Sequence, residues 1–205
     1  MKITRKGDAE SREQVQDVAD SNPLSMKKTI WTFGLIAGAI LSLFMVATIP
    51  FLDRIGFDKG AVIGYTGMVA AFLLVFFGVR SYRDNVRGGT IGFGRALLVG
   101  VAITAVASAC YTATWEVLYF KFMPDFAEKY GEYAVQRARS QGKSEAEVAK
   151  TRTEMQRFQE SYRNPLYNSA VTFLEPLPVG LLISLVSAGI LRRKRPDGEA
   201  ALVAA

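Results

Sequence analysis

The sequence predicts an all-α protein, a bundle of four transmembrane helices with a periplasmic helical hairpin between helices three and four. Four long stretches are apolar and almost free of charge, although 21% of the 205 residues are Asp, Glu, Lys or Arg. Each stretch approaches or exceeds the roughly 20 residues that cross a bilayer core at about 1.5 Å per residue. The charged residues lie between and beyond these stretches, and in the charged segment after the third stretch the apolar residues recur at helical spacing.

The four expected spans are 30–52, 61–79, 96–122 and 171–191. The first follows Lys27 and Lys28 as a signal peptide would, but its apolar core is too long and no A-x-A cleavage site follows it. The loop 80–95 between the second and third spans is rich in glycine, which favours turns. The third span is long enough to tilt or to project beyond the bilayer.

Two tails flank this membrane domain of residues 26–195. Residues 1–25 are polar, have no apolar face and are expected to be disordered. Met26 opens the hydrophobic part as the first residue of a bacterial membrane protein would, so the sequence leaves open whether translation starts there or at Met1. Residues 196–205 form a short C-terminal tail.

Small residues recur at intervals of four within the spans. Gly34 and Gly38 form a GxxxG motif that Ser42 continues, and similar spacings occur in the second and third spans. Residues of this size let the backbone of another helix approach closely. We therefore expect helix contacts at Gly34, Gly38, Gly64, Gly100 and Gly180.

Residues 124–168 are predicted to form an antiparallel helical hairpin, with a break at Gly142-Lys143. Ser144 and Glu147 then have the spacing of a capping box, in which each group caps the other. Two apolar faces are expected to pack together, although a partner helix would suit the same spacing. The faces comprise Phe126, Tyr130, Tyr133 and Ala134 before the break and Val148, Met155, Phe158 and Tyr162 after it. Asn164-Pro165 ends the hairpin and can start the last helix, with Pro at its first position.

Basic residues at the flanks predict the orientation. Lys27 and Lys28, four arginines in the loop 80–95 and the four consecutive bases 192–195 all lie on one side of a four-span arrangement. Lys and Arg near a span resist translocation, so this side is expected to be cytoplasmic, with both termini there. The protein is then expected in a bacterial inner membrane.

Composition excludes several functional classes. There is no histidine and one cysteine, Cys110, so the usual zinc, copper and haem sites and histidine-assisted nucleophiles are excluded. We therefore expect no catalytic, cofactor-binding or metal-binding residue and no enzyme. The net charge of +6 comes from bases that flank the spans, and no basic stripe with interleaved aromatics predicts nucleic-acid binding.

One group of residues could carry chemistry. Glu116 and Glu175 occupy similar depths in two antiparallel spans, beside Tyr111, Trp115 and Tyr119. Facing each other, the carboxylates could share a proton, hold a cation or line a ligand pocket, and Pro176 and Pro178 would free carbonyl acceptors nearby. The simpler alternative is that both acids reach the membrane surface and pair with Arg54 or Lys121, while the prolines mark a helix start or kink.

Three motifs resemble an uncharacterised bacterial family of integral membrane proteins, domain of unknown function 4199. They are Gly94-Arg95-Ala96, Pro124-Asp125-Phe126, and Phe173-Leu174-Glu175 followed by Gly180. The resemblance covers about residues 26–194 and implies a four-helix membrane fold without an assigned activity.

The functional expectation is a non-enzymatic structural or assembly protein in the lipid bilayer. Its partner would be an envelope protein or further copies of itself, reached through the periplasmic hairpin. The alternative is a small oligomeric transporter or ion-coupled protein that uses Glu116 and Glu175 within the membrane.

Overall fold

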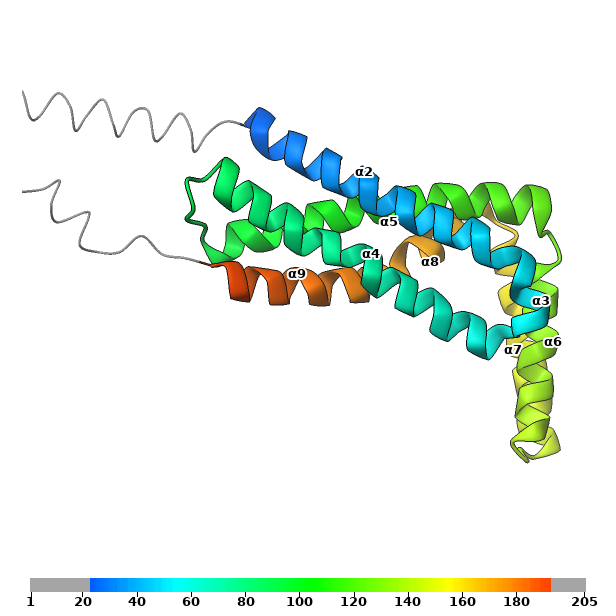
Figure 1. Cartoon of the computed structure of the whole chain (residues 1–205). Helices are drawn as coiled ribbons and strands as arrows, with labels where there is room; N and C mark the ends of the chain where they lie inside the picture. The colour runs from blue at the N-terminus through cyan, green and yellow to red at the C-terminus, as the bar shows by residue number, and fades with distance from the viewer. Residues whose placement is uncertain (1–22, 193–205) are drawn as a thin grey trace, which may run out of the picture. The chain divides into compact units, whose positions relative to one another are not determined.

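The computed structural model describes residues 23–192, and all regular structure within them is helical (Figure 1). The elements are α2 (Pro23–Thr48), the 3-10 turn η1 (Ile49–Phe51), α3 (Leu52–Ile55), α4 (Phe57–Asn85), α5 (Phe93–Phe122), α6 (Phe126–Ser140), α7 (Glu145–Tyr162), α8 (Pro165–Leu174) and α9 (Leu177–Leu191). The all-α prediction is confirmed. Of the two predicted tails, residues 1–22 and 196–205 lie outside the described part, whereas Pro23 already begins α2.

Within residues 23–192, four stretches are long and apolar enough to cross a membrane: Met26–Phe51, Phe57–Asn85, Phe93–Phe122 and Pro165–Leu191. The four predicted spans are therefore confirmed, but all four begin before the predicted apolar stretches, at residues 26, 57, 93 and 165. The loop predicted over 80–95 is helical as far as Asn85, because polar side chains do not interrupt the backbone hydrogen bonds of a helix that is already formed.

The last span is broken beside Pro176, a residue at which the sequence predicts either freed carbonyl acceptors or a helix start or kink. α8 ends at Leu174 and α9 begins at Leu177. Pro176 has no N–H to donate to the carbonyl of Thr172, so the helical ladder is interrupted beside Glu175. Glu175 itself still donates its backbone N–H to Val171 O, at 3.2 Å.

The chain divides into two compact units, each with its own packing. The first unit comprises residues 23–37, 72–106 and 179–192 of the described part. Its core is aliphatic and aromatic, with Phe72, Val75 and Ile103 fully buried. Helices come close where a residue is small: a Cβ added at Gly78 would lie 2.6 Å from Ile103 Cδ1.

The second unit comprises residues 38–71 and 107–178 and includes the hairpin. Its core contains Met45, Trp115, Tyr119, Ala127 and Tyr162. Ser42 of α2 is hydrogen-bonded to α5, since it accepts from Thr114 Oγ1 at 2.8 Å. The packing of this unit is thus aromatic and polar at the ends of the spans from which the hairpin departs.

The hairpin of α6 and α7 lies in the second unit, and in Figure 1 it runs across the direction of the C-terminal part of α5. The capping box of Ser144 and Glu147 is present as predicted, and Gly142 makes the turn with a φ of 72°, a conformation that glycine adopts without steric cost. Asn164 caps α8 as predicted, because its side chain accepts from Leu166 N at 2.9 Å.

The two faces of the hairpin pack differently from the prediction. α6 turns the small residues Ala127, Gly131 and Ala138 inward, and a Cβ at Gly131 would lie 3.4 Å from Met155 Cβ of α7. Three aromatic residues of α6 instead surround Phe57 at the start of α4: Phe126, Tyr130 and Tyr133, with ring centroids 5.8, 5.4 and 5.0 Å away. The aromatic face therefore ties the hairpin to a span, and Tyr130 with Phe158 is its ring contact to α7.

Candidate functional site

The three aromatic residues predicted for the site lie on one face of α5, because Tyr111, Trp115 and Tyr119 recur every four residues. Trp115 is 9% exposed and Tyr119 is 3% exposed. Both rings are held from several sides: Trp115 packs edge-on against Phe126 at 4.8 Å, and Tyr119 against Tyr162 at 5.1 Å. Each such pair stabilises packing by about 0.5–1.5 kcal/mol beyond the area it buries.

A chain of buried side-chain hydrogen bonds runs through this aromatic cluster. Trp115 Nε1 donates to Tyr162 Oη at 2.9 Å, and Tyr162 Oη lies 3.5 Å from Thr172 Oγ1. Thr172 gives its single proton to Asn168 Oδ1, at 3.3 Å, so Tyr162 is the donor to Thr172. Asn168 is fully buried, and its Nδ2 donates to the backbone carbonyl of Tyr162 at 3.2 Å, so the hydrogen bonds return to Tyr162. The chain therefore fixes the ends of α7 and α8 to α5.

The local sequence explains this closure. Tyr162 is the last residue of α7, so its carbonyl has no partner within that helix. Asn164 and Pro165 restart the chain as α8 at once, which brings Asn168 in the second turn of α8 back to that carbonyl. Burial raises the pKa of the Tyr162 phenol, which keeps it protonated as a hydrogen-bond donor.

Glu175 meets one of the predicted aromatic residues. Tyr111 Oη donates to Glu175 Oε2 at 3.1 Å, and the Glu175 side chain is exposed. This carboxylate lies at the break between α8 and α9, well inside the candidate span Pro165–Leu191. An acid, a tyrosine and a helix break therefore lie together at this point, while the predicted pairing of Glu175 with Glu116 stays a prediction.

Glu116 has different surroundings. Its Oε1 is buried and has no hydrogen-bond partner in the part of the chain that the structure describes, and the same holds for Ser108 Oγ. Ser108 and Glu116 lie two turns apart on one face of α5, and between them Thr112 Oγ1 donates to Ser108 O at 2.9 Å. Glu175 is hydrogen-bonded to Tyr111, so a contact between the Glu116 and Glu175 carboxylates stays a prediction.

Sequence reasoning missed three members of the polar chain. Asn168 and Thr172 were not singled out, and Tyr162 was assigned to packing alone. One signal could have indicated them, since Asn168 and Thr172 are polar residues one helical turn apart in an otherwise apolar segment. Their partner Tyr162 belongs to another helix, and no spacing along the chain reveals that contact.

Four of the five predicted packing glycines lie against another helix. An added Cβ would lie 2.7 Å from Val106 at Gly34, 2.6 Å from Cys110 at Gly38 and 2.9 Å from Ser184 at Gly100. At Gly180 it would overlap Thr104 Cγ2. Gly64 is different, because no described atom lies within 4 Å of the added Cβ.

Charged groups hold α6 against the start of α4. Arg137 Nη1 lies 2.5 Å from Asp58 Oδ1 and donates to Tyr133 Oη at 2.9 Å. A hydrogen bond to the Asp58 carboxylate raises the pKa of the Tyr133 phenol. Elsewhere in residues 23–192, no three His, Cys, Asp or Glu side chains come together as a metal ion would require.

These features define a helical membrane protein with four spans and a hairpin between the third and fourth. Residues 32–193 match the model of a family described as a protein of unknown function, DUF4199. The chain belongs to this family, and the resemblance seen in its motifs is confirmed. No curated protein and no solved structure matches the chain.

Proposed function

We propose that the protein is a non-enzymatic interaction protein, in which the membrane spans hold the α6–α7 hairpin in a fixed position for a protein partner. The contrast between the two sides of the hairpin carries this proposal. On one side, Tyr162 and Arg137 are bonded to residues of the spans or their ends. On the other side, polar side chains remain exposed along both helices. A fixed base with an open outer surface is what a docking module needs.

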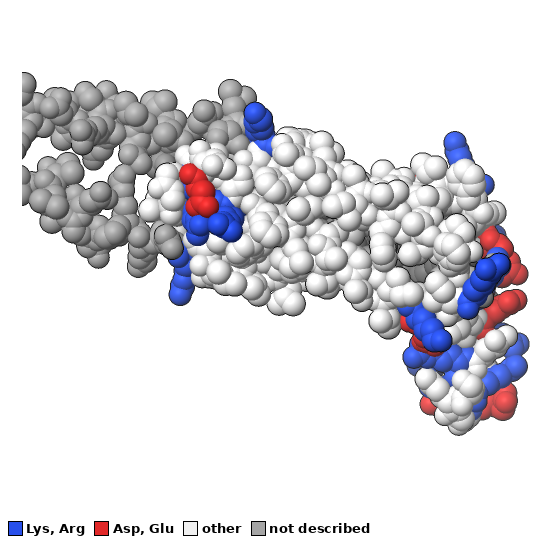
Figure 2. All heavy atoms as spheres, viewed as in Figure 1, with Lys and Arg blue, Asp and Glu red and all other residues white. Residues whose placement is uncertain are grey.

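The open side contains a groove of about 470 Å³ between α6 and α7. It is lined by Glu128, Gly131, Glu132, Val135, Gln136, Arg139, Arg152, Met155, Gln156 and Gln159. Figure 2 shows that acidic and basic side chains both gather over the hairpin on the face in view. A groove with charges of both signs favours a protein segment with complementary charges over a polyanion such as nucleic acid.

The proposal also places the protein in the inner membrane of a bacterium, with both termini cytoplasmic and the hairpin in the periplasm. The distribution of Lys and Arg around the spans supports this orientation. The partner would then be a protein of the cell envelope or a further copy of the chain. Absence of histidine from the sequence supports a non-enzymatic role.

Site-specific photocrosslinking in cells tests the proposal. Gln156 lines the groove, whereas Thr153 is exposed on the same helix outside it. Benzoylphenylalanine at position 156 should give a discrete crosslinked protein product, and the same residue at position 153 should not. Arg152→Glu should abolish the product, because it reverses a charge of the groove. Equal products from both positions, or none from either, would contradict a docking role for this groove.

A second candidate is a small oligomeric ion-coupled transporter, favoured by the Tyr111–Glu175 hydrogen bond at a broken span. Broken helices expose carbonyl acceptors that bind ions in known transporter folds. Proteoliposomes with an internal pH dye would report proton flux. The transporter hypothesis expects flux that Glu175→Gln removes and Glu154→Gln, on the exposed hairpin, retains. Absence of flux from the unmodified protein would reject proton coupling.

A further inference from the structure

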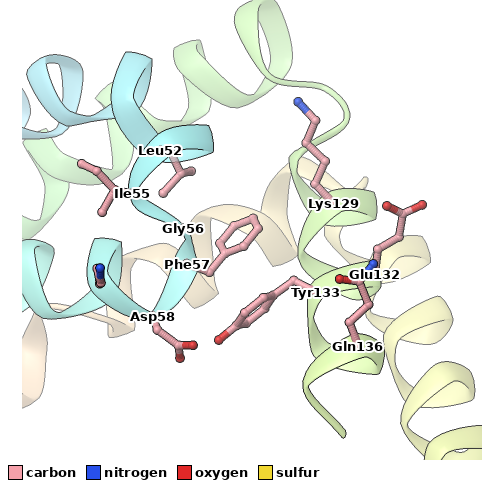
Figure 3. Close-up of a pocket in the computed structure, with 10 residues that line it drawn as sticks. Leu52, Ile55, Gly56, Phe57, Asp58, Lys129, Glu132, Tyr133 and Gln136 are labelled. Carbon is pink, nitrogen blue, oxygen red and sulfur yellow. The ribbon is translucent and has the colours of Figure 1, made fainter. Parts of the chain in front are cut away.

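We propose that a second pocket, beside the start of α4, binds the headgroup of a zwitterionic phospholipid with a primary ammonium, phosphatidylethanolamine. The pocket has a volume of about 430 Å³ (Figure 3). Residues before and at the start of α4 line it together with residues of α6: Leu52, Ile55, Gly56, Phe57, Asp58, Lys59, Lys129, Glu132, Tyr133 and Gln136.

The position of the pocket favours a lipid over a soluble ligand. It lies in the connector between two candidate spans, one ending at Phe51 and the next beginning at Phe57. This level corresponds to the surface of the bilayer. Leu52 and Ile55 form an apolar part of its wall, and nearby in sequence Phe51 of η1 and Val62 of α4 are 51% and 67% exposed. A headgroup in the pocket would therefore have an apolar surface along which its acyl chains can extend.

The charges of the pocket match a zwitterion. Lys59 and Glu132 both line it, and neither is in an ion pair within the described residues. The other two charged residues of the lining are already paired, Asp58 with Arg137 at 2.5 Å and Lys129 with Asp125 at 2.9 Å. One cation and one anion thus remain to be compensated by a bound molecule. A phosphodiester would pair with Lys59, and an ammonium with Glu132.

The remaining wall favours a primary over a quaternary ammonium. The amide oxygen of Gln136, one turn after Glu132 on α6, adds an acceptor that an –NH₃⁺ group with three donors can use beside the Glu132 carboxylate. A choline group has no N–H, and its recognition requires open aromatic faces. The Phe57 ring already contacts three other rings, with centroids 5.0–5.8 Å away. In Figure 3 the Phe57 and Tyr133 rings extend into the same space from α4 and α6.

The lipid pocket shares Glu132 and Gln136 with the proposed partner groove, but its opposite wall comes from residues 52–59 and that of the groove from α7. Binding of a lipid needs no partner protein, and the photocrosslinking experiment above uses positions on α7. Failure of either experiment therefore leaves the other conclusion standing.

Native mass spectrometry and thermal unfolding of the full chain test the lipid site. The detergent-solubilised protein is mixed with phosphatidylethanolamine, phosphatidylcholine or phosphatidylglycerol of matched acyl chains. Phosphatidylethanolamine should be retained preferentially and should raise the midpoint of unfolding, because a ligand that binds the folded state stabilises it. Equal retention of the ethanolamine and choline lipids would overturn the proposal.

Two variants assign the contacts. Glu132→Gln should weaken phosphatidylethanolamine binding about tenfold, the effect of losing one charge-assisted hydrogen bond, and leave phosphatidylcholine binding unchanged. Lys59→Gln should weaken both lipids, since both carry the phosphate. Glu128→Gln is the matched control, one turn earlier on α6 and outside the lipid pocket. Equal ethanolamine-lipid binding by the Glu132 and Glu128 variants would contradict the assignment.

Discussion

The two compact units of this protein are held together in different ways. In the first unit, helices meet at small residues, and the side-chain hydrogen bond between Thr104 of α5 and Ser184 of α9 is long at 3.4 Å. In the second unit, stacked and edge-on rings surround a buried polar chain from Trp115 to Asn168. Small residues allow close contact where lipid provides no hydrophobic drive for helix association. The polar chain instead fixes the hairpin in one arrangement at the ends of the spans.

This difference predicts that the two units lose stability through different kinds of substitution. The first unit should lose stability when a larger side chain replaces a small residue between two helices, because the helices can make room only by losing their close contact. The second unit should lose stability when a hydrogen-bonding group is removed, because the remaining partner stays buried without a hydrogen bond.

The largest effect is expected for Gly180→Leu in the first unit. Its Cβ would overlap Thr104 Cγ2, so α9 must move away from α5. We expect a loss of roughly 3 kcal/mol in the free energy of unfolding, the upper part of the range for overpacking. Thermal unfolding in detergent measures it. Gly64→Leu is the control, since no described atom lies near that Cβ, and a comparable loss there would break the comparison.

A somewhat smaller effect is expected for Asn168→Leu in the second unit. The leucine keeps the volume but leaves the Tyr162 carbonyl and the Thr172 hydroxyl without their partner. We expect a loss of about 2 kcal/mol, the cost of unsatisfied buried groups. The neighbouring Tyr167→Leu, at a position that is 43% exposed, should change stability little. Equal free energies of unfolding for the two variants would show that the polar chain does not stabilise this unit.

The Trp115–Tyr162 hydrogen bond should appear as a coupling free energy. Trp115→Phe and Tyr162→Phe each remove one side of the same 2.9 Å bond. Each should cost about 1–2 kcal/mol, and the double variant should cost less than their sum by about 1 kcal/mol. Denaturant unfolding of the four proteins gives the cycle. Strict additivity would show that the two side chains act separately.

The smallest effect concerns the exposed tip of the hairpin. Ser144 Oγ and N–H both donate to Glu147 Oε2, at 2.7 and 2.9 Å, and these bonds lower the pKa of Glu147. Because the folded pKa is lowered, the capping box contributes above the unfolded pKa and is lost as pH falls through the folded pKa. Ser144→Ala should raise the Glu147 pKa toward its ordinary value, as carboxyl NMR would detect. An unchanged titration would show that the hydroxyl does not stabilise the carboxylate.

The sequence predicted those features that depend on spacing along one helix. Apolar length predicted the four spans, intervals of four predicted the contacts at Gly34, Gly38, Gly100 and Gly180, and capping rules predicted Ser144 and Asn164. The sequence pattern that predicts each of these features lies within one segment of the chain.

The features that the sequence did not predict depend on which helices meet. The pattern of Gly64 resembles that of Gly38, yet only Gly38 has a neighbouring helix within 4 Å of an added Cβ among the described residues. The sequence predicted no contact for Phe57, which lies in a short connector between two predicted spans, although three rings of α6 surround it. The candidate site shows the same limit, since Tyr111 and Glu175 were expected together but Asn168 and Thr172 were not.

Sided labelling of two cysteines tests the central claim, a four-span bundle that carries its hairpin on one side of the membrane. In a Cys110→Ser background, single cysteines replace Ser140 in the hairpin and Asn85, at the exposed end of α4. An impermeant maleimide applied to right-side-out vesicles should label Ser140→Cys at once and Asn85→Cys only after permeabilisation. Labelling of both cysteines from the same side would contradict the account.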